Sequence, residues 1–146
     1  IEDARGQMKD FHAPFCCLPG DAFAAAGALR PHETLRNDGQ LVYYDAVEEV
    51  RDARRQGLVF VFISHQWLDF ARPDPDNAHF VASTRALASV AAAENVGLDR
   101  LRVWIDYLSI PQSNERAQKL AVSSLPTFAS CVDYFCVVAP DATHRG

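Results

Sequence analysis

Two apolar segments of the chain, residues 58–63 and 101–105, each end in a group of polar and aromatic residues. The candidates for chemistry in these two groups are Ser64, His65, Trp67, Asp106, Tyr107 and Gln112. An aromatic platform surrounded by hydroxyl, imidazole, amide and carboxylate groups suits a nucleotide-like ligand. The sequence therefore predicts a ligand pocket formed by these residues.

The same residues also allow a purely structural explanation. Asp106 could bind backbone amides of its own turn, Trp67 could cover the core, and His65 could be a structural histidine. Gln112, with Glu115 after it, is typical of the solvated start of a helix. Both explanations are open, and the sequence gives no residue a firm catalytic role.

The sequence lacks other recognisable catalytic or metal-binding motifs. Residues 73–79 contain aspartates and a histidine, but no Cys/His zinc spacing accompanies them, so we expect a rigid turn and a helix cap. His32 and Glu33 are followed by no second histidine at the zinc-protease interval, and there is no GxGxxG, P-loop or GxSxG motif. Cys136 belongs to an apolar segment, where a thiol usually packs. We predict no metal site.

The segments that would position the candidate pocket alternate between strand and helix. The expected order is a strand over 58–63, a helix over 77–97, a strand over 101–105, a helix from Ser113 that Pro126 bends or restarts, and a strand over 132–138. This order predicts an α/β fold with a parallel sheet, helices on both faces and right-handed crossovers. Ligands of such sheets bind beyond the carboxyl ends of the strands, where the candidate residues lie.

The first 57 residues are less regular. Asp45 and Glu48 resemble a capping box that opens a helix ending near Gly57, and weaker signals indicate a short helix over 21–29 and an edge strand over 40–44. We therefore expect one domain overall, in which residues 1–57 form an irregular, partly helical extension that packs on an α/β core of residues 58–146.

Composition narrows the class of protein. The chain has 146 residues, of which 49% are hydrophobic and 23% are charged, as in ordinary globular domains. The net charge of -5 opposes binding to nucleic acid. No apolar run approaches the ~20 residues that cross a bilayer, so we expect no direct membrane insertion.

The four cysteines do not resemble a secreted disulfide framework, because two are adjacent and two lie in or beside an apolar run. We therefore expect reduced thiols and an intracellular protein, with the cytoplasm favoured. Because the chain begins at Ile1, an organelle reached after removal of a leader stays open.

Several motifs together are similar to a known family. Residues 62–67, 73–75, 103–107 and 110–112 resemble the Toll/interleukin-1 receptor (TIR)-like superfamily, in particular its divergent branch in large proteins of dinoflagellates and other algae. The Trp-Ile-Asp segment in 103–107 is also similar to that of fungal heterokaryon-incompatibility domains. The resemblance covers about residues 58–140.

This resemblance implies a flavodoxin-like sheet. Many TIR-like domains are assembly modules, and some cleave NAD with a glutamate on the helix after the third strand. The chain stops at Gly146, before that position, and Glu115 on the preceding helix cannot take the role by identity alone. Our first hypothesis is therefore a protein-interaction module, a scaffold or subunit of a larger complex without catalysis of its own. The alternative is a nucleotide-processing enzyme, similar to an NAD glycohydrolase, completed by residues beyond Gly146 or by another chain.

The strand expected over 132–138 is a candidate interaction edge. Its residues are apolar on both faces, and the sequence after it is too short for a further strand or helix to cover it. The edge candidates are Tyr134, Phe135, Cys136, Val137 and Val138. An open edge is a template for pairing, so we expect a partner protein or a continuation of the parent chain to cover it.

Overall fold

A computed structural model of the chain describes residues 10–65, 77–111 and 114–138. These residues form a five-stranded sheet in the order β2-β1-β4-β3-β5. The strands are β1 (Asp10–Pro19), β2 (Val42–Ala46), β3 (Val59–His65), β4 (Leu101–Ile105) and β5 (Tyr134–Val138). β3 pairs in parallel with β4 and β5, whereas β1 pairs antiparallel with β2 and β4.

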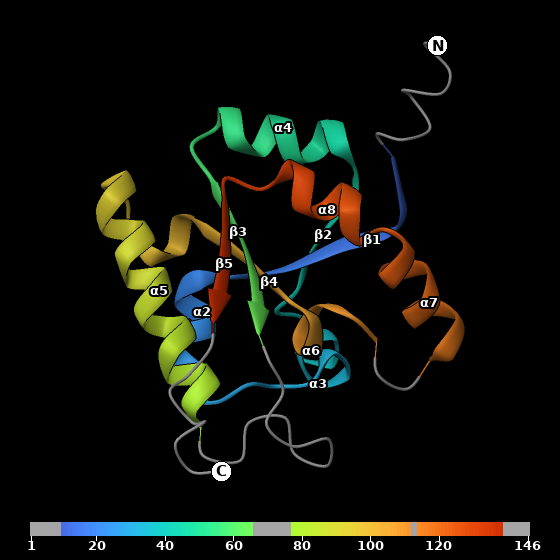
Figure 1. The fold of residues 1–146 in the computed structure, drawn as a ribbon, viewed down its shortest axis with the longest axis horizontal. Helices are drawn as coiled ribbons and strands as arrows, with labels where there is room; N and C mark the ends of the chain where they lie inside the picture. The colour runs from blue at the N-terminus through green and yellow to red at the C-terminus, as the bar shows by residue number, and fades with distance from the viewer. Residues whose placement is uncertain (1–9, 66–76, 112–113, 139–146) are drawn as a thin grey trace.

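Helices lie on both faces and at both ends of the parallel strands. They are α2 (Gly20–Ala25), α3 (His32–Asn37), α4 (Val47–Arg55), α5 (Ala78–Glu94), the 3-10 helix η1 (Leu98–Arg100), α6 (Asp106–Ser109), α7 (Glu115–Ser123) and α8 (Leu125–Cys131). Figure 1 shows α4 near the amino ends of β3 and β5, and α3 and α6 near the carboxyl ends of β3 and β4. The α/β class predicted from the sequence is confirmed.

The three strands predicted with the clearest pattern are all present, and their burial explains that pattern. Along β3, Phe60 and Phe62 belong to one core layer, while Val61 and Ile63 belong to the other. A strand buried on both faces needs apolar residues at every position, which produces a continuous apolar run in place of alternation.

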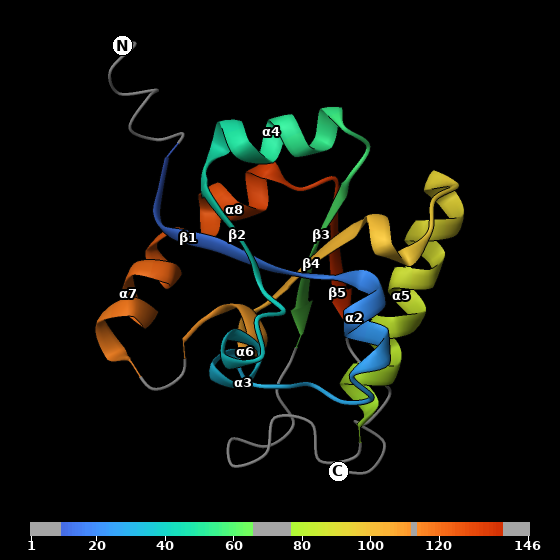
Figure 2. The same ribbon diagram turned by 180° about the vertical axis from the view of Figure 1, so that it is seen from behind.

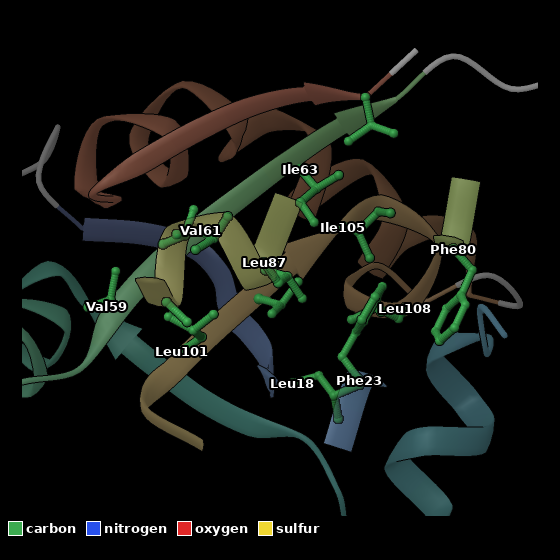
Figure 3. Packing of buried hydrophobic residues seen from close by; sticks show 14 of the residues in the cluster. Leu18, Phe23, Val59, Val61, Ile63, Phe80, Leu87, Leu101, Ile105 and Leu108 are labelled. Carbon is green, nitrogen blue, oxygen red and sulfur yellow. The ribbon is translucent and has the colours of Figure 1, made fainter. Parts of the chain in front are cut away.

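The first core layer lies between the sheet and α5, with α2 beside it. Leu87 of α5 is 1% exposed and lies among side chains of β3 and β4, including Val61 and Ile105 (Figure 3). Phe23 of α2 stacks on Phe80 of α5 with ring centroids 5.2 Å apart, so the two helices also contact each other.

The second core layer is aromatic and lies between the sheet and α4, α7 and α8. Phe128 of α8 stacks on Phe15 of β1 at a centroid distance of 4.7 Å, and Phe60 also stacks on Phe15, at 6.1 Å. The connection from β4 to β5 thus covers the face opposite α5, as expected for helices on both faces.

The parallel pairing predicted for the later strands is confirmed for β3, β4 and β5, but the sheet as a whole is mixed, because the front part of the chain adds two antiparallel strands. The predicted edge strand over 40–44 corresponds to β2, but β1 was not expected (Figure 2). β1 contains Pro14, which lowers strand propensity, and its pairing with β2 shifts register between Asp10 and Phe15. The local sequence of β1 therefore gives no clear strand pattern, and the strand forms because it pairs with β2 and β4.

The first turns of three helices, α5, α4 and α7, are held by contacts other than those expected. Asn77 precedes α5 with φ of 60°, and its Nδ2 donates to Gly27 O at 3.0 Å without capping α5. At α4 the side chain that accepts backbone N–H groups is Glu49, from Asp45 and Ala46, and not Glu48. Ser113, where the sequence predicts the start of a helix, lies outside the described residues, and Asn114 caps α7 by accepting from Ala117 N through Oδ1 at 2.9 Å.

Candidate functional site

The residues predicted to form a pocket lie, where the structure describes them, at the carboxyl ends of β3 and β4. Ile63 of β3 pairs with Ile105 of β4, so Ser64 and Asp106, the next residues, stand at the same level of neighbouring strands. His65 ends β3 and pairs through its backbone with Val138 of β5. Two further members of the predicted set, Trp67 and Gln112, lie outside the described residues.

Asp106 begins helix α6, where the sequence led us to expect a turn. The helix is held by Ile110 N, which donates to Asp106 O at 2.9 Å, and by Ser109 Oγ, which accepts from Ile105 N at 3.2 Å. A helix this short has too little periodicity to be predicted. The Asp106 and Tyr107 side chains are half-buried, and a carboxylate in the first turn of a helix is favoured by the helix dipole.

His32 lies next to this rim, although the sequence indicated no role for it. His32 belongs to α3 and is 3% exposed. Its Nδ1–H donates a hydrogen bond to Leu108 O of α6 at 3.2 Å. Burial lowers the pKa of His32 below its usual 6.5, and the hydrogen bond to Leu108 opposes that shift in part. His32 is therefore neutral near pH 7 and joins α3 to α6. The contact spans 76 residues of sequence, so no local pattern could have shown it.

The cysteines are poor nucleophiles. Burial raises the pKa of the Cys16 thiol to about 12 and that of Cys17 well above its usual range. Burial also raises the pKa of Cys136. The thiolate is the reactive form of cysteine, so these raised pKa values keep the three thiols protonated near neutral pH.

β5 forms one edge of the described sheet, and its two faces differ. Tyr134, Cys136 and Val138 pack toward the core layer beneath α5, and the Tyr134 hydroxyl donates to Glu94 Oε2 of α5 at 2.5 Å. On the other face Phe135 and Val137 are 53% and 73% exposed. The covered face and the exposed face therefore alternate along the strand.

Phe135 is the outer member of an aromatic stack that crosses three strands. Its ring lies 4.8 Å from Phe62 of β3, at an interplanar angle of 12°. Phe62 in turn lies 4.3 Å from Trp104 of β4, at 15°. Register explains the stack, because Phe62 pairs with both neighbours in the sheet. Trp104 and Phe62 are buried, so only the outermost ring reaches the surface.

A groove of about 520 Å³ lies at the opposite, amino end of β3, and sequence reasoning did not anticipate it. Arg54 of α4 lines it and pairs with Asp133 at 2.6 Å, while Asp133 Oδ2 also accepts from Phe60 N at 2.8 Å. Arg51 and Arg55 line it too, and each pairs with a carboxylate on its own helix. All three arginines of the groove therefore have carboxylate partners within the chain.

Comparisons with protein-family models, with curated proteins and with solved structures found no match. Within residues 10–65, 77–111 and 114–138, no group of three or more His, Cys, Asp or Glu side chains could hold a metal ion. In the same ranges, none of the helices combines the length and the apolar character needed to cross a membrane.

Proposed function

We propose that this protein is an interaction module of TIR-like, flavodoxin-like fold that assembles with another protein through β5 and has no catalysis of its own. The observation that carries the proposal is the exposure of Phe135 and Val137 on an edge strand. Monomeric proteins seldom leave apolar side chains together on an unpaired edge, because such an edge binds further strands.

The arrangement of the parallel strands supports the flavodoxin-like part of the proposal. Among the three parallel strands, β3 comes first in the chain and lies between β4 and β5, which follow it. In flavodoxin-like sheets the first strand likewise lies between the second and the third. The antiparallel β1 and β2 are an addition next to β4.

The proposed partner is a protein inside the cell and not nucleic acid, in line with the net charge of -5. The test is to purify the tagged chain from its natural source and to quantify the proteins that accompany it. Val137→Lys should remove the specific partner, because a lysine on an edge strand opposes pairing. Val122→Lys is the matched control, since Val122 is 51% exposed on α7, away from β5. Equal recovery of the partner with both variants would contradict the proposal.

A second candidate is a nucleotide-processing enzyme similar to an NAD glycohydrolase, completed by further residues or by another chain. The common level of Ser64 and Asp106 at the carboxyl ends of β3 and β4 supports it, because ligands of open α/β sheets bind there. The test is to incubate the chain with NAD and to follow nicotinamide release. Turnover that Asp106→Ala abolishes, and that the control Asp99→Ala in η1 retains, would favour this candidate over the interaction module.

A further inference from the structure

We infer that the partner of β5 is the β5 strand of a second copy of this chain, bound antiparallel about a two-fold axis at Cys136. The inference rests on the proposed function, because it identifies what pairs with the same edge. The two sheets would then continue into each other across the interface, with the interface formed by the same patch of both copies.

The side chains of β5 are complementary to themselves in this register. A two-fold axis at Cys136 sets Phe135 opposite Val137 of the second copy, and Tyr134 opposite Val138 of the second copy. All five residues of the strand are then paired. Aromatic and β-branched side chains that face each other across two strands are among the stabilising cross-strand pairs. The Phe135–Val137 pair occurs twice and covers the two most exposed side chains of the strand.

The charges near the edge also permit self-association. β5 contains no charged residue and no proline, the two features that most often protect an edge strand from pairing. Two carboxylates lie beside the strand, and both have partners within the chain. Asp133 pairs with Arg54 at 2.6 Å, and Glu94 accepts from the Tyr134 hydroxyl at 2.5 Å on the face beneath α5. The axis at Cys136 is also preferable to one at Phe135, which would set Asp133 opposite Val137 of the second copy.

Both faces of β5 are already held in place. On one face the Phe135 ring stacks on Phe62, with ring centroids 4.8 Å apart. On the other face the Tyr134 hydroxyl donates a hydrogen bond to Glu94 Oε2. Side chains fixed before association lose less conformational entropy when the partner binds. The edge is therefore prepared to receive a strand without rearrangement.

The first test measures association of the full chain by sedimentation velocity, from micromolar to several hundred micromolar. We expect a concentration-dependent dimer. Val137→Lys should weaken the association constant about tenfold or more, because the lysine replaces an apolar partner of Phe135. The control Val122→Lys should leave association unchanged, and circular dichroism should show that both variants keep the fold, since both positions are exposed.

The second test measures the register by disulfide formation in a Cys136→Ser background. Chains carrying Phe135→Cys are mixed with chains carrying Val137→Cys and oxidised with diamide, which takes up the two hydrogens that the thiols lose. Opposite residues have Cα atoms about 4.5–5.5 Å apart, within disulfide range. Copies of the same variant would place the new cysteines diagonally, about 7–8 Å apart, so we expect covalent dimers from the mixture and not from either variant alone.

A wild-type chain that stays monomeric throughout the range contradicts the inference, and so does a Val137→Lys variant that associates as the wild type does. Covalent dimers that form equally in the unmixed variants contradict the register. If the chain is monomeric but binds a different protein in a manner that depends on Val137, the proposed function stands and the second copy is excluded as the partner. If nothing depends on Val137, both are wrong.

Discussion

Asp133 illustrates how much a single residue contributes to the position of β5. Its Oδ2 accepts from Phe60 N of β3 at 2.8 Å, its Oδ1 pairs with Arg54 of α4 at 2.6 Å, and its backbone N–H donates to Phe60 O at 2.9 Å. The side chain is 23% exposed, so solvent screens its charge only in part. Asp133 therefore connects the start of the edge strand β5 to the neighbouring strand β3 and to α4.

We expect Asp133→Ala to reduce the free energy of unfolding by about 1–3 kcal/mol, because it leaves the N–H of Phe60 without its acceptor. Urea denaturation measures the effect. The control is Asp52→Ala, which removes an ion pair with Arg55 in which both side chains are more than 60% exposed. Exposed pairs contribute about 0–1 kcal/mol, so a control loss as large as that of Asp133→Ala would contradict the assignment.

His32 should make stability depend on pH. Its pKa in the folded chain is lowered below 6.5, mainly by burial, so its contribution is complete above pH 6.5. As the pH falls through that value, the unfolded chain binds a proton that the folded chain resists, and the free energy of unfolding decreases. Urea denaturation at pH 7.5 and 5.5 should show a smaller decrease for His32→Gln than for the wild type. Equal decreases would show that His32 is not responsible.

At the scale of elements, the close approach of α2 to the start of β4 depends on a glycine. A Cβ atom at Gly20 would lie 2.5 Å from Leu98 O and 2.9 Å from the Cβ of Leu101. Leu98 O is a backbone atom and the Leu101 Cβ is bonded to the backbone, so neither can rotate out of the way. A side chain at position 20 would therefore push α2 away from η1 and β4. Glycine is therefore required here for space and not for an unusual φ.

Gly20→Ala should destabilise the chain by about 1–3 kcal/mol, as overpacking of a core commonly does. The matched control is Gly97→Ala, whose new Cβ meets only the Asp99 side chain, at 2.5 Å, and that side chain can rotate away. Thermal unfolding of the two variants provides the comparison. A Gly97→Ala variant that is the less stable of the two would contradict the packing described for α2.

The elements that the sequence predicted are those with a strong local pattern. β3, β4, β5 and α5 consist of apolar runs or of helical spacing long enough to recognise. β1 was missed because Pro14 and a register shift break its pattern, and only pairing with β2 and β4 makes it a strand. α3, with six residues, and α6, with four, were missed because helices this short carry little periodicity. α2 is as short as α3, and the sequence predicted it over 21–29 only from weak signals.

Local sequence patterns also predicted only part of the candidate site. Ser64 and Asp106 were expected to lie side by side, because parallel strands end at the same edge of a sheet. The contact of His32 with Leu108 depends on tertiary structure alone, and so does the bridge from Asp133 to Arg54. The sequence showed that all five residues of β5 are apolar. Only the structure showed that α5 covers the face of Tyr134, Cys136 and Val138.

At the scale of the whole molecule, the described sheet has two different edges. β2 ends the sheet with antiparallel pairing to β1, and β5 ends it with an uncharged, partly exposed strand. Alternate residues of a strand direct their amides to opposite sides, so only some amides of β5 bind β3. The others face the open edge, where a bound strand would take them up.

Amide hydrogen exchange across Tyr134–Val138 tests this open edge most directly. In the dilute single chain we expect slow exchange for the amides that bind β3 and fast exchange for those between them, which gives an alternating pattern. If the edge pairs as proposed, the fast amides should become slow in the concentrated chain or with the proposed partner bound. The Val137→Lys variant should keep the alternating pattern under the same conditions. Uniformly slow exchange in the dilute monomer would contradict the proposal, because the edge would then already be covered within one chain.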